Sequence, residues 1–293
     1  MKTRTPEGSS GFFLNAFVEG NALPKVIAVI PVFNEEKTLL NILSRVNRQV
    51  DYLVCVNDGS ADETINILRS FARKGKKLFI VDLPQNRGMA GALKAGFLFV
   101  LYLLKLKFVR LEDIVVTIDA DGQHKPEYIR KVVAYLLQRK VDVVLTRRNF
   151  TVYPLYKILG NRFLTWTNSI LSGVKYKDVE SGFRLLRVKT LGPILNYYTG
   201  VKYSCAQEIA LISARSGFKI DNDFQVDIAY YRPGTTLWDG FIVLFLSLVT
   251  FIRWRLKIFS VSSPSSSQME NAFRGSKELW TGEKGRRKVK NGF

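Results

Sequence analysis

Mostly apolar runs recur along the first half of this chain, and the run at 26–32 has no polar position at all. A strand buried on both faces of a sheet has this pattern, whereas a half-exposed strand alternates apolar and polar residues. Segments with helical spacing of apolar residues separate the runs. We predict strands over 26–32, 52–56, 78–82, 114–118 and 141–145, and helices over 35–48, 62–74, 89–106 and 126–138. This alternation predicts an α/β fold with a mostly parallel central sheet and helices on both faces.

The segment at 237–259 has another pattern. Its uninterrupted apolar stretch, Phe241–Ile252, is shorter than the roughly 20 residues that a spanning helix needs. Trp238 and Trp254 flank the stretch, and amphipathic aromatic side chains suit the headgroup region of a bilayer. We predict a helix that lies in or dips into a membrane interface. A buried core helix and a tilted or oligomerised span are the alternatives.

The charge balance narrows the choice of partners. The chain of 293 residues has a formal net charge of +19, which implies an anionic partner: a membrane surface, a nucleic acid or a phosphorylated substrate. Cys55 and Cys205 are the only cysteines, so neither a disulfide framework nor a Cys/His zinc site is expected, and a reducing cytoplasm fits. No basic segment followed by an apolar core opens the chain, so we expect no secretory signal.

Two carboxylates, Asp119 and Asp121, directly follow the apolar run 114–118. Residues i and i+2 of a strand point to the same side, and open α/β sheets bind ligands in the crevice outside the strand ends. Two adjacent carboxylates without a basic partner repel each other and resist burial. A divalent cation removes that penalty, and Mg²⁺ or Mn²⁺ typically bridges protein carboxylates and a diphosphate. The alternative is an acidic turn at a strand end.

Five further polar segments accompany this pair in a fixed order. The six segments are Ile30-Pro31-Val32-Phe33-Asn34-Glu35-Glu36, Val56-Asn57-Asp58-Gly59-Ser60, Asn86-Arg87-Gly88, Asp119-Ala120-Asp121-Gly122-Gln123-His124, Asp178-Val179-Glu180-Ser181-Gly182-Phe183-Arg184 and Tyr231-Arg232. Together they resemble the family 2 glycosyltransferases of the GT-A fold. Within that family they are similar to the polyprenyl-phosphate hexosyltransferases of the dolichyl-phosphate mannosyltransferase type. The resemblance covers residues 25–235.

The resemblance implies a metal-dependent, inverting transfer of a hexose from a nucleotide-sugar to a polyprenyl phosphate. It implies Mg²⁺ or Mn²⁺ as the cofactor, held by Asp119, Asp121 and Gln123, with His124 close by or structural. We expect Gly88 to allow close backbone approach to the donor and Lys94 to counter phosphate charge. The expected donor contacts are Pro31, Phe33, Glu35, Asp58, Gly88, Lys94 and Asp119.

The acceptor half of the chain is rich in arginine, whose planar fork matches phosphate oxygens. The candidate contacts to an acceptor phosphate are Arg148, Arg162, Arg184 and Arg232, and the candidate catalytic residues are Asp121, Asp178, Arg148 and Arg232. A sugar hydroxyl as acceptor is the alternative, and it calls for a carboxylate base. Asp178 could be that base or could orient its loop. Glu180 departs from the family pattern, and no Gln-x-x-Arg-Trp motif predicts processive synthesis.

The chain then divides into an N-terminal extension (1–24, with one short helix near 12–18), a GT-A catalytic domain (25–235), a hydrophobic membrane-interface helix (236–259) and a basic, disordered tail (260–293). We expect a peripheral or shallowly inserted enzyme at the cytoplasmic face of a membrane, with a nucleotide-sugar, a lipid phosphate and an anionic membrane surface as partners. Three rival classes are a haloacid-dehalogenase-type phosphatase, a non-catalytic nucleotide-sugar-binding module and a nucleic-acid-binding protein. Asp-x-Asp-Gly follows the fourth strand rather than the first, which disfavours the phosphatase, and the chain has no nucleic-acid-binding motif.

Overall fold

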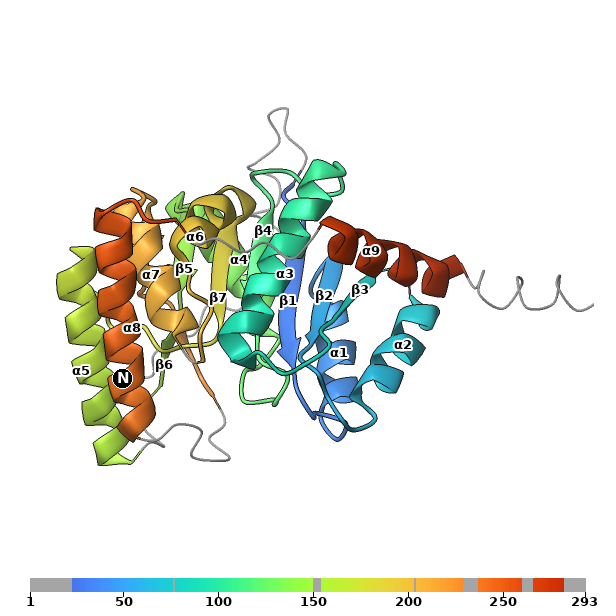
Figure 1. Ribbon diagram of the computed structural model, residues 1–293, viewed down its shortest axis with the longest axis horizontal. Helices are drawn as coiled ribbons and strands as arrows, with labels where there is room; N and C mark the ends of the chain where they lie inside the picture. The colour runs from blue at the N-terminus through green and yellow to red at the C-terminus, as the bar shows by residue number, and fades with distance from the viewer. Residues whose placement is uncertain are drawn as a thin grey trace, which may run out of the picture.

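The computed structural model describes residues 23–75, 77–149, 154–202, 204–228, 237–259 and 266–281. The predicted N-terminal extension, apart from its last two residues, lies outside this part of the chain, as does its short helix. The described chain forms one large sheet covered by helices on both faces (Figure 1).

The central sheet has seven strands in the order β3-β2-β1-β4-β7-β5-β8. These strands are β1 (Val26–Val32), β2 (Tyr52–Asn57), β3 (Leu78–Asp82), β4 (Ile114–Thr117), β5 (Val143–Leu145), β7 (Arg184–Arg187) and β8 (Ile220–Asp221). β7 runs antiparallel to both neighbours, β4 and β5, while the other pairs are parallel. A separate parallel pair joins β6 (Arg147–Arg148) to β9 (Gln225–Val226). The predicted α/β fold with a mostly parallel sheet is confirmed.

The helices begin and end close to the predicted positions in the first half of the chain. The helices are α1 (Leu39–Asn47), α2 (Thr64–Lys74), α3 (Gly88–Lys105), α4 (Tyr128–Arg139), α5 (Leu155–Ser172), α6 (Leu191–Tyr197), α7 (Cys205–Arg215), α8 (Leu237–Arg255) and α9 (Ser266–Thr281), with a 3₁₀ turn, η3, at Val188–Thr190. The helix predicted from residue 35 begins only at Leu39, because residues 35–38 form a turn closed by a hydrogen bond from Thr38 N to Glu35 O.

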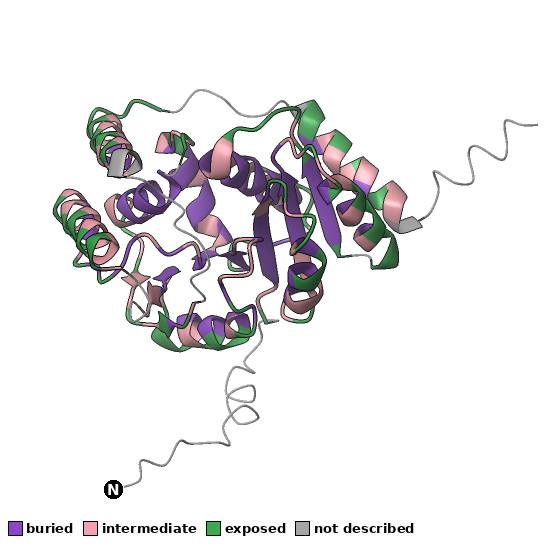
Figure 2. Cartoon of the chain, turned by 90° about the horizontal axis from the view of Figure 1, so that it is seen from below, coloured by how far each residue is buried: buried purple, intermediate pink, exposed green. Residues whose placement is uncertain are grey.

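Alternation along the strands builds two cores, one on each face of the sheet. Ile27 and Val29 of β1 point into the core under α3, α6 and α7, while Ala28 and Ile30 point into the core under α1, α2 and α4. Both sets are fully buried, as Figure 2 shows for the central strands. The continuous apolar runs therefore mark strands covered on both sides.

α3 is the one helix in the described residues that is long and apolar enough to cross a membrane. It packs against β1 and β2 and carries ten buried residues, so it is a core helix of the domain. Its closest approach to the sheet is at Gly96, where an added Cβ would lie 2.4 Å from Val29 Cγ1 and 3.2 Å from Val56 Cγ2.

Gly96→Ala is therefore expected to lower the free energy of unfolding by about 1–3 kcal/mol, because the extra methyl group overpacks the core. Denaturant unfolding followed by circular dichroism measures the change. Gly192→Ala in α6 is the matched control, since nothing lies within 4 Å of its added Cβ. Equal stability of the two variants would contradict the tight helix–sheet contact.

The C-terminal segments pack on opposite ends of the domain (Figure 1). α8 lies against α5 and α7, and Thr250 Oγ1 donates a hydrogen bond of 2.7 Å to the buried Glu208 carboxylate. α9 lies against β3 and α2, with Phe273 stacked on Phe79 at 5.9 Å and Ser276 Oγ accepting from Ile80 N at 3.0 Å. The prediction of a disordered tail is wrong for residues 266–281, because their apolar side chains cover the edge of the sheet.

Candidate active site

A cavity of about 150 Å³ opens where β1, β2 and β4 end. The carboxyl ends of parallel strands meet at one edge of the sheet, so residues far apart in the sequence converge there. Its lining residues are Pro31, Val32, Phe33, Glu35, Asp58, Met89, Ala92, Asp119, Ala120 and Asp121. Six of the predicted donor or metal residues thus share one cavity: Pro31, Phe33, Glu35, Asp58, Asp119 and Asp121. Phe33 is 44% exposed, which leaves its ring free to stack on a ligand.

Asp58 organises the loop before α3. Its Oδ1 accepts a hydrogen bond of 2.7 Å from Arg87 N. Burial raises the pKa of Asp58, although the backbone N–H groups of Arg87 and Gly88 oppose that shift. Gly88 has φ +74°, a conformation that favours glycine, and its N–H donates to Asn86 Oδ1 at 2.8 Å. Gly88 therefore shapes this turn beside the cavity, and it is not itself among the lining residues.

The two aspartates after β4 are held close together in a poorly solvated site. Burial raises the pKa of Asp121, and the nearby Asp119 charge raises it further. Burial also raises the pKa of Asp119, although Arg184 and Arg148 act in the opposite direction. Gln123 donates to both oxygens of Asp121, from its backbone N at 2.9 Å and from its Nε2 at 2.8 Å. A positive ion placed here would relieve the repulsion between the carboxylates.

His124 lies behind this pair. Its Nε2 is 3.8 Å from Asp119 Oδ2, and its ring packs against Phe183 at 5.7 Å. Burial lowers the pKa of His124 to about 4, so the imidazole is neutral at pH 7. Its Nδ1 has no hydrogen-bond partner among the described residues. These contacts agree with the expectation that His124 is close to the metal-binding candidates or structural and is not itself a metal ligand.

Gly182 lets Asp119 occupy its position. A Cβ at Gly182 would lie 2.3 Å from Asp119 Oδ2, and Thr117 Oγ1 fixes the same turn by donating to Gly182 O at 2.7 Å. Arg184, two residues further, is only 2% exposed. The expectation that Arg184 contacts an acceptor phosphate does not fit this buried position. Its charge instead counteracts the burial-induced rise in the pKa of Asp119.

Arg148 and Asp178 form a buried ion pair next to these residues. Arg148 Nε and Nη2 donate to the two oxygens of Asp178 at 2.9 and 3.0 Å, and Arg148 N adds a third bond of 2.9 Å. Asn161 of α5 joins both side chains. Burial alone would raise the pKa of Asp178, but the charge and hydrogen bonds of Arg148 together with the Asn161 hydrogen bond outweigh it, and the pKa is lowered. Asp178 is fully buried, so the geometry favours its alternative role of orienting Arg148 and the loop.

The other predicted cationic contacts lie elsewhere. Arg162 is exposed on α5, one residue after Asn161. Lys94 lines a second cavity on the far side of α3 and not the cavity at the strand ends, so the expected contact between Lys94 and donor phosphate is not supported. Arg232 lies outside the described residues.

Two residues were not identified from the sequence. Met89 enters the cavity from the first turn of α3, and Gln207 of α7 donates from Nε2 to Glu180 Oε1 at 2.5 Å. Burial raises the pKa of Glu180, and the Gln207 bond opposes that shift. The packing of the helices places these residues, and no local sequence motif predicts it.

The donor set at the strand ends fits a shared metal. No group of three or more His, Cys, Asp or Glu side chains that could hold a metal occurs among the described residues. Mg²⁺ is commonly bound by one or two carboxylates together with substrate phosphates rather than by an all-protein cage. Asp119 and Asp121 match that donor set. The side-chain oxygen of Gln123 joins them once the amide is flipped, because Nε2 and not the oxygen now lies against Asp121.

A mostly parallel sheet with paired aspartates after β4 indicates the class of GT-A nucleotide-diphospho-sugar transferases. The family model of glycosyl transferase family 2 matches residues 27–191, and the chain belongs to this family of glycosyltransferases. It is 28% identical to a UDP-N-acetylglucosamine–dolichyl-phosphate N-acetylglucosaminyltransferase from Methanococcus voltae, over 76% of this chain and 95% of that protein. It is also 28% identical to an undecaprenyl-phosphate mannosyltransferase from Micrococcus luteus, over 79% of this chain and 94% of that protein.

The fold has a counterpart among solved structures. Glucosyl-3-phosphoglycerate synthase from Mycobacterium tuberculosis, solved with Mn²⁺, uridine diphosphate and phosphoglyceric acid, superposes with a TM-score of 0.57. The two chains are 17% identical, and the match covers 86% of this chain and 84% of that one. The GT-A fold is thereby confirmed.

Proposed function

We propose that this protein transfers a hexose from a nucleotide-sugar to a polyprenyl phosphate of the dolichyl type, with inversion at the anomeric carbon. The convergence of Asp58, Asp119 and Asp121 on one cavity carries the donor half of the proposal. The two relatives whose printed names specify polyprenyl-phosphate acceptors support the acceptor half.

Different residues of the chain bind the donor and the acceptor. Pro31, Phe33 and Asp58 hold the base and ribose, and the Gly88 turn lets the backbone approach the diphosphate. Asp119 and Asp121, with Gln123, would hold Mg²⁺ or Mn²⁺. That ion supplies charge stabilisation to the departing nucleoside diphosphate.

Arg148, from the acceptor half of the chain, holds the lipid phosphate. An acceptor phosphate oxygen attacks the anomeric carbon from the side opposite the leaving group, so the glycosidic C–O bond breaks and its electrons leave with the nucleoside diphosphate. A phosphate is already ionised at pH 7, so no base has to remove a proton. The ion pair with Asp178 fixes the guanidinium for this contact, which is an electrostatic form of preorganisation.

A donor-by-acceptor screen tests this function. The full chain is incubated with Mn²⁺, a panel of nucleoside-diphosphate sugars and either a short polyprenyl phosphate or a free sugar, and released nucleoside diphosphate is measured. We expect turnover that requires the lipid phosphate and stops in EDTA. Turnover with a sugar hydroxyl acceptor instead of the lipid phosphate would refute the acceptor assignment, and no turnover with any donor would refute the activity.

An apolar surface suits a lipid acceptor. α5 and α8 lie side by side (Figure 1). Each of the two helices exposes large apolar side chains to solvent. These side chains are Leu155, Tyr156, Leu159, Phe163, Trp166 and Ile170 of α5, and Phe241, Phe245, Leu248 and Ile252 of α8. Contiguous exposed apolar surface marks an interaction site. We propose that this α5–α8 face rests on the cytoplasmic membrane surface, which extends the membrane role predicted for 237–259 to a helix pair.

Phe245→Asp is expected to weaken binding to anionic vesicles about 10- to 100-fold, because transferring one large apolar side chain into the bilayer is worth about 1.5–3 kcal/mol. Phe245 is 64% exposed, so the fold should tolerate the change. Vesicle co-sedimentation measures binding. Leu111→Asp is the control, since Leu111 is also exposed but lies between α3 and β4, away from this face. Equal losses in both variants would remove the proposed membrane face.

A further inference from the structure

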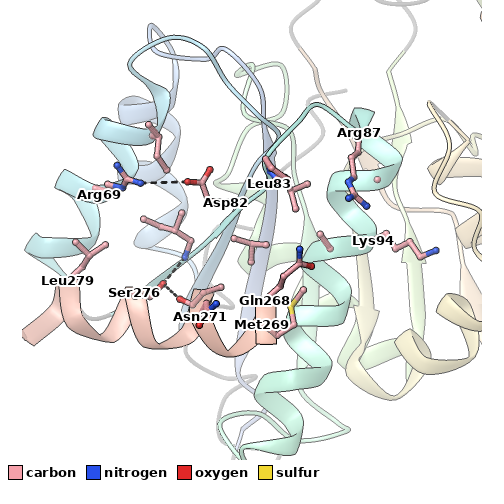
Figure 3. A pocket seen from close by; sticks show the side chains of 18 of the residues that line it. Arg69, Asp82, Leu83, Arg87, Lys94, Gln268, Met269, Asn271, Ser276 and Leu279 are labelled. Carbon is pink, nitrogen blue, oxygen red and sulfur yellow. Dashed lines mark hydrogen bonds and ion pairs between the residues drawn. The ribbon is translucent and has the colours of Figure 1, made fainter. Parts of the chain in front are cut away.

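A second cavity, larger than the first, lies along the edge strand β3. It measures about 970 Å³ and is walled by α2, β3, α3, α9 and the turn at 199–200 (Figure 3). None of its lining residues lines the cavity at the strand ends. The two cavities touch opposite sides of α3: Met89 and Ala92 face the first, whereas Gly91 and Lys94 face the second.

Cations surround this cavity from two sides. Arg69 and Arg73 come from α2, and Arg87 and Lys94 come from the start of α3 on the opposite wall. Figure 3 shows Arg69 and the α3 pair on either side of Leu83. Asp82 is the one carboxylate among the lining residues, and its oxygens already meet Arg69 at 3.6 Å and Asn57 Nδ2 at 2.7 Å.

The other three cations of the lining are not neutralised by an ion pair within the described residues. Among the described residues, Arg73, Arg87 and Lys94 form no ion pair. The Nζ of Lys94 donates to Tyr198 O at 3.5 Å. Burial lowers the pKa of Lys94, the Glu208 carboxylate partly opposes this, and Arg253 and Arg87 lower it further. Lys94 is half-buried, whereas the three arginines are exposed. Charges of one sign that line a cleft attract an anion more strongly than the same charges spread over an open surface.

The lining also provides apolar area. Ile80, Leu83 and Met269 form apolar parts of the wall, and Gln268 and Asn271 of α9 add amide groups. Small-molecule sites commonly enclose about 300–1,000 Å³ and combine apolar walls with a few polar groups. The guanidinium forks of arginine match phosphate oxygens. The combination therefore fits an organic phosphate better than a bare ion.

We propose that this β3-edge cavity is a second ligand site, which binds a soluble organic molecule carrying a phosphate or diphosphate group. The apolar α5–α8 face lies at the other end of the molecule from α2 and α9 in both views (Figures 1 and 2), so a chain resting on that face holds this cavity away from the lipid. Arg87 connects the two cavities, because its backbone N–H bonds Asp58 while its side chain lines the second site.

Calorimetry of the full chain with inorganic pyrophosphate in EDTA tests the site, because without divalent metal the paired aspartates repel this anion. We expect saturable binding that becomes at least about tenfold weaker in Arg73→Gln and in Lys94→Gln, since each removes one charged hydrogen bond. Lys74→Gln is the matched control. Lys74 follows Arg73 on α2 and is exposed like Arg73, but it does not line the cavity, so its loss should leave the affinity within twofold.

Three outcomes would overturn the proposal. Absence of saturable binding to the unmodified chain removes the site. Equal weakening by Lys74→Gln and Arg73→Gln reduces it to diffuse surface charge. If phosphatidic-acid vesicles, and not pyrophosphate, bind in a way that depends on Arg73, the ligand is a membrane headgroup rather than a soluble phosphate.

Discussion

Asp121→Asn is expected to lower kcat for sugar transfer by at least about 100-fold, the scale of losing one preorganised charge-stabilising group. The side chain keeps its shape but loses the charge that would bind the divalent ion beside the donor diphosphate. Stability should be equal or higher without metal, because burial and the nearby Asp119 raise the pKa of Asp121 and make its ionised form unfavourable in the folded state. Released nucleoside diphosphate measures turnover, and denaturant unfolding in EDTA measures stability.

Asp223→Asn is the control for this variant. Asp223 is half exposed and pairs with Lys177 away from the cavity, so the same loss of charge should leave turnover unchanged. A fall in stability for Asp121→Asn, with turnover lost in proportion, would mean that Asp121 supports the fold rather than the reaction. Full turnover by Asp121→Asn would contradict a metal-binding role.

Asp178→Ala is expected to lower the free energy of unfolding by about 3–5 kcal/mol, the usual penalty for leaving one partner of a buried ion pair uncompensated. The stranded group is Arg148, whose side chain is only 15% exposed and donates twice to Asp178. Arg148→Ala should have a similar effect. The double variant should lose less than the sum, because it leaves neither charge unpaired.

The same variants decide between the two roles of Asp178. A residue that positions Arg148 should affect stability and the KM for polyprenyl phosphate, with little change in the pH profile of kcat. A general base should affect kcat and its acidic limb while leaving stability intact. We expect the first outcome, because Arg148 lowers the pKa of Asp178 and, with Asn161 and the Glu180 N–H, occupies its oxygens.

The donor side of the site could be predicted because its signals are local. Pro31 lies near the end of β1, Asp58 directly follows β2 and Asp119 closely follows β4, and parallel strands bring their carboxyl ends to one edge. Lys94 shows the limit of this reasoning. It stands on the correct helix, but its position around the axis of α3 decides which side it faces, and it faces the β3-edge cavity.

On the acceptor side, the sequence indicated candidate residues by their type but not their contacts or burial. Arg148 and Asp178 were both identified as candidates, yet their pairing across 30 residues depends on how β6 packs against the loop before β7. Arg184 is the same residue type as the exposed Arg162, and only its place inside the sheet shows that it is buried and acts on Asp119. The register of an antiparallel β7 between β4 and β5 sets that position.

The sequence by itself determined the order of strands and helices, the family and the carboxylates at the strand ends, because these follow from local periodicity and from motifs read along one chain. The tertiary structure decided which polar groups neutralise each other, that α5 joins α8 in one apolar face and that α9 closes the β3 edge around a cationic cavity. Those features depend on contacts between segments distant in the sequence, and the free energy of such contacts is set by packing and burial rather than by any local pattern.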